Sequence, residues 1–169
     1  RGNITLINDE SDIEVTGENA VRGKDVSFDA AGNIYNEHRI EAENTASLTA
    51  KKNILNAGGE IKVANKVTLN AGEILWNLAS ITSTNSDVEL IAGQAVLNTT
   101  SSSAEKPEGA PANAAGTITA ANGSVVISTT QLLADDVLGG VYNNATITAS
   151  NSVIINSNDD AYNTGSITA

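Results

Sequence analysis

Residues 67–77 (VTLNAGEILWN) and residues 88–98 (VELIAGQAVLN) repeat one another at an offset of 21 residues. Each stretch opens with apolar residues that alternate with mostly polar ones, passes through an Ala-Gly pair, and ends on an apolar pair followed by Asn. Alternation over a few residues is typical of a β-strand with one buried face. The repeated unit therefore predicts short strands joined by tight turns.

The Asn that ends each stretch recurs along the chain, each time after an apolar or aromatic pair. The members are Asn36, Asn56, Asn77, Asn98, Asn143 and Asn163. Successive members are 20, 21, 21, 45 and 20 residues apart, so the long interval holds one period and an insertion. We expect these side chains to form a ladder at one corner, in which stacked amides hydrogen-bond along an axis.

Each period of about 20 residues has room for three short strands, and equivalent positions recur in the same order and direction. This pattern is typical of coils stacked in parallel, with like residues above like residues about 4.8 Å apart. The prediction is an all-β fold, a right-handed parallel β-helix (β-solenoid) of about seven three-strand coils. We expect residues 1–169 to be a single β-helix segment cut from a longer protein.

Two insertions interrupt the period, and both fall in one coil. Residues 101–115 (SSSAEKPEGAPANAA) contain both prolines of the chain and predict a mobile loop outside the tube. Residues 131–140 (QLLADDVLGG) carry leucine and valine at helical spacing before Gly139-Gly140, which predicts a short helical turn with a glycine stop.

Composition excludes several classes of function. The chain has 9 basic and 20 acidic residues, and a net charge of −11 disfavours nucleic acid and anionic membrane surfaces as partners. No apolar run reaches the length that spans a bilayer, so we expect no membrane insertion. The absence of Cys excludes a disulfide scaffold, a Cys-ligated zinc site and a thiol nucleophile. We expect no cofactor and no metal.

Residues 67–74 (VTLNAGEI) and 86–93 (SDVELIAG) resemble the V-x-L-x-A-G-x-I-x-N repeat of filamentous haemagglutinin-like exoproteins. The resemblance covers about residues 25–169. These two-partner-secretion proteins include large adhesins and the stalks of contact-dependent growth-inhibition toxins. The resemblance implies export through an outer-membrane β-barrel transporter and a location in the medium or on the outer surface of a Gram-negative bacterium. It also implies attachment to cells, surfaces or biofilm matrix through a receptor or glycan of a host or neighbouring cell.

A carbohydrate-active β-helix, such as a polysaccharide lyase or hydrolase, is the competing interpretation. Adjacent acids occur at 135–136 and at 159–160, and paired carboxylates are what glycoside hydrolysis requires. The three Arg residues, at positions 1, 22 and 39, lie far from both acid pairs in the sequence. The single His38 is expected in a surface turn. We therefore expect a non-enzymatic segment.

Two further possibilities depend on repeated polar residues. Thr-x-Thr occurs at 82–84, 117–119 and 146–148, and a flat ladder of such pairs would suit ice binding. Glu41 and Lys62 are expected to interrupt that face. Calcium at acidic turns is the other possibility, but the nonapeptide repeat of calcium-binding β-helices is missing.

The alternation that turns Asn inward also predicts an outward column, our candidate ligand or partner face. Its members are Tyr35, Leu55, Trp76, Leu97, Tyr142 and Tyr162, which include all three Tyr residues and the only Trp. Rings on a rigid face can stack on sugars or contact a partner chain. They can equally stabilise neighbouring coils, or lie beneath residues 131–140. We also expect end-to-end self-association, because terminal coils of a solenoid leave strand edges unpaired.

Overall fold

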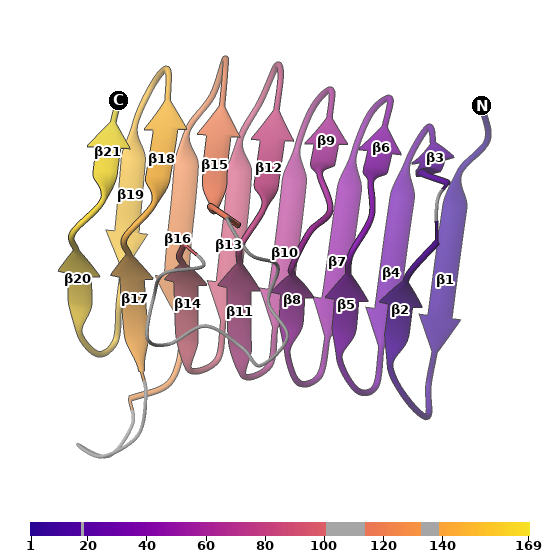
Figure 1. Cartoon of the computed structure of the whole chain (residues 1–169), viewed down its shortest axis with the longest axis horizontal. Helices are drawn as coiled ribbons and strands as arrows, with labels where there is room; N and C mark the ends of the chain where they lie inside the picture. The colour runs from indigo at the N-terminus through magenta and orange to yellow at the C-terminus, as the bar shows by residue number, and fades with distance from the viewer. Residues whose placement is uncertain (18, 101–113, 133–138) are drawn as a thin grey trace.

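The computed structural model describes residues 1–17, 19–100, 114–132 and 139–169 of the chain. These residues form a right-handed parallel β-helix with seven coils (Figure 1). Each coil contributes one strand to each of three parallel sheets, and the N- and C-terminal coils lie at opposite ends of the axis. The described residues contain no helix. At about 4.8 Å per coil, the seven coils span about 30 Å.

Strands three apart in sequence pair with one another. Sheet A contains β1 (Ile4–Asn8), β4 (Val26–Ala30), β7 (Ala46–Ala50), β10 (Val67–Ala71), β13 (Val88–Ala92), β16 (Val125–Thr129) and β19 (Val153–Asn156). Sheet B contains β2 (Ile13–Val15), β5 (Ile34–Asn36), β8 (Ile54–Asn56), β11 (Ile74–Asn77), β14 (Ala95–Asn98), β17 (Gly140–Asn143) and β20 (Ala161–Asn163). Sheet C contains β3 (Val21–Gly23), β6 (Ile40–Ala42), β9 (Ile61–Val63), β12 (Ser80–Ser83), β15 (Thr117–Ala120), β18 (Thr146–Ala149) and β21 (Ser166–Thr168).

The register places like residues above like residues. In sheet A, Leu69 pairs with Leu48 in the preceding coil and with Leu90 in the following one. In sheet C, Ile81 pairs with Ile61 and Ile118. These inward side chains are buried in one continuous core along the axis. Because the tube is narrow, branched aliphatic residues and Ala fill it, and Phe28 is the one ring in this core among the described residues.

The two insertions interrupt the coil at different corners. The first follows β14 and the second follows β16, so both fall between Asn98 and Asn143. The predicted mobile loop and helical turn fall largely on residues 101–113 and 133–138, which lie outside the described residues.

An isolated antiparallel bridge joins Thr100 to Ala115 at the two ends of the first insertion. The predicted end of the second insertion was wrong by one residue, because Gly140 is the first residue of β17. Gly140 has a φ of 95°, and a Cβ there would collide with the carbonyl oxygen of Asp160. The start of β17 therefore requires glycine at position 140.

The Asn ladder runs along the inside of sheet B. Each side-chain Nδ2 donates to the Oδ1 of the next member at 2.7–2.8 Å, in one direction from Asn36 to Asn163. The first five members are at most 2% exposed. Some amides also donate to the carbonyl of a residue in sheet C, as Asn98 does to Thr146 at 3.2 Å. The ladder thus satisfies buried amides and joins two sheets at their shared corner.

The ladder has one unsatisfied end. Asn36 Oδ1 is buried and has no hydrogen-bond partner. The residue that pairs with Asn36 in the first coil is Val15, which has no donor to offer. The other members of the ladder accept a hydrogen bond at Oδ1 from the preceding Asn, so the ladder begins at Asn36 and does not extend to Val15.

Two shorter polar ladders stabilise the other corners, and the sequence reasoning missed both. At the corner before sheet B, Asn33 donates to Asp12 and Asn53 donates to Asn33. At the corner before sheet A, Asp25 accepts hydrogen bonds from the Thr45 hydroxyl at 2.8 Å and the Asn44 amide at 2.7 Å. These two bonds, that from Thr45 first, lower the pKa of the Asp25 carboxyl below its ordinary value.

The terminal strands of every sheet pair on one side only. Apolar residues there are exposed, among them Leu6 and Ile7 in β1 and Ile154 in β19. Such edges can accept a further strand from any source. End-to-end self-association therefore stays a prediction.

Asn56→Ala should lower the free energy of unfolding by about 2–4 kcal/mol, because it leaves Asn36 Nδ2 and Asn77 Oδ1 without their ladder partners. Urea denaturation measures the change. Asn163→Ala is the matched control at the exposed end of the ladder and should cost less than about 1 kcal/mol. Equal costs for the two variants would contradict a buried, cooperative ladder.

Val15→Asn should couple favourably to Asn36, since a new Nδ2 at position 15 can donate to the unsatisfied Asn36 Oδ1. We expect a coupling free energy of about 1–2 kcal/mol in a double-mutant cycle with Asn36→Val. The measurement is chemical denaturation of the two single variants and the double variant. Additive effects would show that the two positions do not meet as the register requires.

Candidate functional site

The outward residues of sheet B form one column in strict register. Each member pairs with the next through the parallel ladder, in the order Tyr35, Leu55, Trp76, Leu97, Tyr142 and Tyr162. None of the six belongs to the core cluster inside the tube. The inward neighbours Ile34, Leu75 and Val141 are buried in that core. The structure therefore brings all six candidate residues together on one sheet face.

Leu97 differs from the other members of the column. It was expected to face the solvent, yet its side chain is 0% exposed. Its neighbours in the adjacent coils are Trp76 and Tyr142. Leu97 therefore offers no accessible surface, and the accessible column is divided into two parts.

The first part is an apolar slot between Tyr35 and Trp76. Leu55 lies between these rings in the intervening coil, and the slot has a volume of about 220 Å³. Asn53, Ile54 and Ile74 complete its lining. The Trp76 indole Nε1 donates to Thr99 Oγ1 at 2.7 Å, which fixes the orientation of the ring.

The second part is a pair of stacked rings at the C-terminal end. The centroids of Tyr142 and Tyr162 are 5.3 Å apart, with an interplanar angle of 24°. Tyr162 is 55% exposed, and its hydroxyl donates to Asp160 Oδ2 at 3.2 Å. The negative charge of Asp160, followed by this hydrogen bond, raises the pKa of the Tyr162 phenol above its ordinary value.

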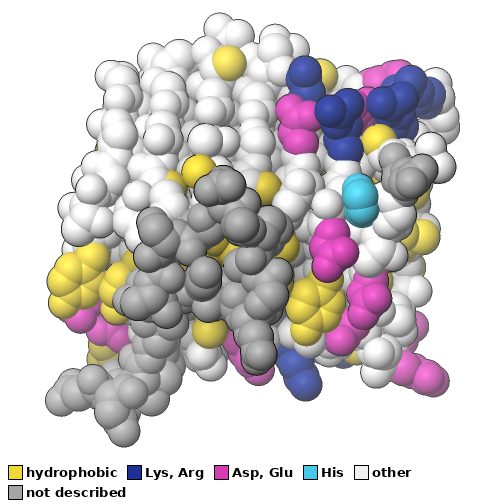
Figure 2. Space-filling model, viewed as in Figure 1, with side chains coloured by type: hydrophobic (Ala, Val, Ile, Leu, Met, Phe, Trp, Pro, Cys, Tyr) yellow, Lys and Arg dark blue, Asp and Glu magenta, His cyan; other side chains and the backbone are white. Residues whose placement is uncertain are grey.

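The outward face of sheet C changes character along the axis. One column passes from charged residues to threonines, in the order Arg22, Glu41, Lys62, Thr82, Thr119, Thr148 and Thr168. A second column of hydroxyls accompanies the threonines and consists of Ser80, Thr117, Thr146 and Ser166. Figure 2 shows charged side chains gathered over the N-terminal coils and a mostly uncharged, polar surface over β12, β15, β18 and β21.

The paired hydroxyl columns on sheet C are the arrangement that ice binding would require. Glu41 and Lys62 do lie in the same column as the threonines, as the sequence predicts. The expected pair at 82–84 was wrong, because β12 ends at Ser83 and the pair in that coil is Ser80 and Thr82. The uninterrupted ladder is therefore confined to four coils.

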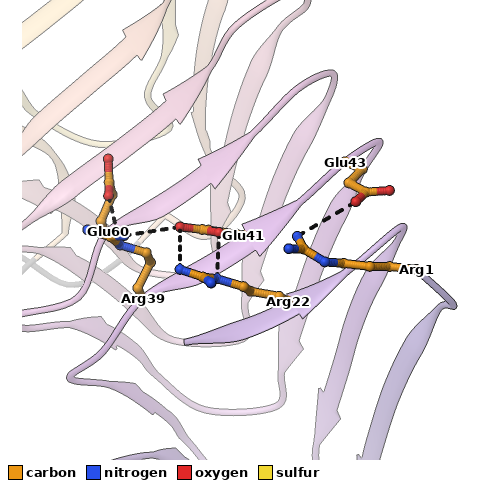
Figure 3. Close-up of polar contacts among 6 residues, drawn as sticks. All are labelled: Arg1, Arg22, Arg39, Glu41, Glu43 and Glu60. Atoms are coloured by element: carbon orange, nitrogen blue, oxygen red, sulfur yellow. Dashed lines mark hydrogen bonds and ion pairs between the residues drawn. The ribbon is translucent and has the colours of Figure 1, made fainter. Parts of the chain in front are cut away.

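An ion-pair cluster occupies the charged end of sheet C (Figure 3). Arg22 Nε lies 2.7 Å from Glu41 Oε2, and Arg39 contacts both Glu41 at 3.2 Å and Glu60 at 3.1 Å. A polar pocket of about 530 Å³ lies beside the cluster and is also lined by His38. Sequence reasoning missed this cluster, although Arg22 and Glu41, like Arg39 and Glu60, lie about one period apart.

The cluster brings acidic and basic side chains together beside this pocket. Both guanidinium groups are already paired with carboxylates, so the cluster ties neighbouring coils together. The acid pair at 135–136 lies outside the described residues, and Asp159 and Asp160 are turn residues before β20. Within the described ranges, no three His, Cys, Asp or Glu side chains are placed to hold a metal ion.

Asp160→Asn should lower the pKa of Tyr162 towards its ordinary value, because it removes the carboxylate charge that raises it. NMR titration of the tyrosine ring carbons in alkaline solution follows each phenol separately. Asp159→Asn is the control and should have a smaller effect, since Asp159 contributes least to the shift. If Tyr162 has the same pKa in Asp160→Asn as in the unsubstituted chain, the observed hydrogen bond is contradicted.

Comparison with known proteins found no matching family model, no matching curated protein and no matching solved structure. No helix in the described part of the chain is long and apolar enough to cross a membrane. The parallel β-helix is thus the established property of the chain.

Proposed function

We propose that residues 1–169 are a rigid, non-catalytic segment of a large secreted or cell-surface adhesin of the filamentous haemagglutinin type. The segment provides reach along its axis and presents one contact face to a receptor or glycan of a host or neighbouring cell. The observation that carries the proposal is the outward column on sheet B, where Tyr35, Trp76, Tyr142 and Tyr162 align in register.

The rarity of aromatic residues strengthens this argument. The chain has five aromatic residues, and four of them belong to this one column. Tyr and Trp are enriched in contact surfaces because their rings bury a large area and keep a polar atom at the rim. A rigid sheet holds such rings in place before binding, which reduces the entropy lost on association.

The stabilising alternative also has support. The Tyr142–Tyr162 stack and the hydrogen bond from Trp76 to Thr99 both join successive coils. Cross-strand pairs of this kind contribute about 0.2–1 kcal/mol each. A stabilising role and a contact role predict different outcomes when the rings are removed, so the two can be separated.

In the carbohydrate-active alternative, the polar pocket beside Arg22, Arg39 and Glu60 would be the substrate site. A hydrolase or lyase built there would need a carboxylate or base that is available to substrate. Glu41 and Glu60 are instead engaged in ion pairs, which disfavours catalysis by either carboxylate.

Export through an outer-membrane transporter and display on a Gram-negative surface follow from the family resemblance and are part of the proposal.

Trp76→Ala with Tyr142→Ala should abolish attachment of beads coated with the chain to epithelial or bacterial cells. Thermal unfolding monitored by circular dichroism should shift by only a few degrees, because both side chains lie outside the core. Thr82→Ala with Thr119→Ala, on the outward face of sheet C, is the matched control and should attach normally. Intact attachment together with a greatly lowered melting temperature would assign the column to stability instead.

A further inference from the structure

The slot on sheet B has the shape of a receptor for one flat side chain. Tyr35 and Trp76 stand two coils apart, which places their backbones about 10 Å from one another. Leu55 in the intervening coil is the shorter side chain and leaves the slot of about 220 Å³ between the rings. All six lining residues belong to β5, β8 and β11 or to the turn directly before β8.

The polar atoms around this slot are already engaged. Asn53 donates from Nδ2 to Asn33 at 3.0 Å and accepts at Oδ1 from the Ile74 backbone at 3.0 Å. Trp76 Nε1 donates to Thr99. Of the polar side-chain atoms in the lining, the Tyr35 hydroxyl alone has no partner among the described contacts. A sugar bound here would gain few hydrogen bonds from the lining, whereas an apolar ring needs none.

The charge beside the slot is negative and uncompensated. Glu14 pairs with Tyr35 in the adjoining coil, is exposed, and forms no ion pair with the described residues. At the neighbouring corner, Lys52 and Glu73 lie in successive coils, so their opposite charges offset one another. A partner that places a cation near Glu14 would complement this charge, and the net charge of −11 would favour its approach.

We propose that the slot between Tyr35 and Trp76 binds an aromatic side chain of a protein partner, with a Lys or Arg of that partner paired to Glu14. This inference rests on the proposed contact function and names the partner class. Glu14 lies two coils from Leu55, about 10 Å, and three residues of extended chain span the same distance. The recognised segment therefore carries its aromatic residue and its cation about three residues apart.

The size of the face argues against a second copy as the occupant. The column from Tyr35 to Tyr162 spans five coil steps, about 24 Å, and at one or two side chains wide it offers about 240 Å². A stable protein–protein interface buries about 800 Å² on each partner. A short partner segment suits the column better than a dimer does.

The test uses the complete chain and a displayed random peptide library. We expect selected peptides to share an aromatic residue and a Lys or Arg about three positions away. Trp76 is the only Trp, so binding of a selected synthetic peptide should shift the intrinsic emission of the chain. Leu55→Phe fills the slot from outside the core and should weaken binding about tenfold, while Thr49→Phe, on the outward face of sheet A, should leave it unchanged. Glu14→Gln should weaken binding about threefold and reduce its salt dependence.

Several results would overturn the proposal. Selected peptides without an aromatic residue, or equal binding to Leu55→Phe and the parent, would rule out the slot as their site. If the chain binds neutral oligosaccharides and Leu55→Phe abolishes that binding, the slot is a glycan site. If the chain forms a dimer and Leu55→Phe dissociates it, the slot binds a second copy. If Leu55→Phe fails to fold, Tyr35→Ala removes one wall and should weaken peptide binding to a similar extent.

The outcome for the slot can be separated from the outcome for the proposed function. If Trp76→Ala with Tyr142→Ala abolishes cell attachment while Leu55→Phe leaves both attachment and peptide binding intact, the column functions and the slot does not. If neither variant changes attachment, the proposed contact function fails as well.

Discussion

Stacking of like residue on like residue, one coil of about 4.8 Å at a time, is the constraint on which the rest of this structure depends. In parallel register every inward position meets its own counterparts above and below. An isolated Asn in such a narrow apolar tube would lose its hydrogen bonds to water, a cost of a few kcal/mol. In the ladder from Asn36 to Asn163, each amide between the two ends donates to one neighbour and accepts from the other. Repetition therefore turns a costly residue into one that fixes the register.

The same register orders the outside of the molecule. A residue type that recurs at an outward position becomes a column on a rigid face, with no further folding requirement. Sheet B carries rings and aliphatic side chains, whereas sheet C carries ion pairs at one end and hydroxyls at the other. Since these side chains lie outside the core, each face can change its chemistry with little cost to the fold. Because core and surface are separate, the segment can carry a contact column on sheet B and still provide rigid reach along its axis.

Much of this architecture can be read from the period alone. Strand positions, the inward Asn residues and the alignment of Tyr35 with Trp76 all follow from alternation and a repeat of about 20 residues. The period predicts which side chains face outward but not how exposed each one is, and for that reason the burial of Leu97 was missed. The Arg39–Glu60 pair was missed because both residues lie just before their strands, where the alternation has not begun. Nor does the period predict the positive φ of Gly140 or the close approach of the Asp160 carbonyl, which leaves no room for a side chain there.

Hydrogen exchange of the Asn side-chain amides is the most direct test of the central claim. NMR can resolve the Nδ2 protons of Asn56, Asn77 and Asn98, which lie in the middle of the ladder, and those of Asn163 at its exposed end. The stacked register predicts that the three central amides exchange only on global unfolding, orders of magnitude more slowly than Asn163. Rapid exchange of the central amides at the rate of a solvated Asn would contradict the account.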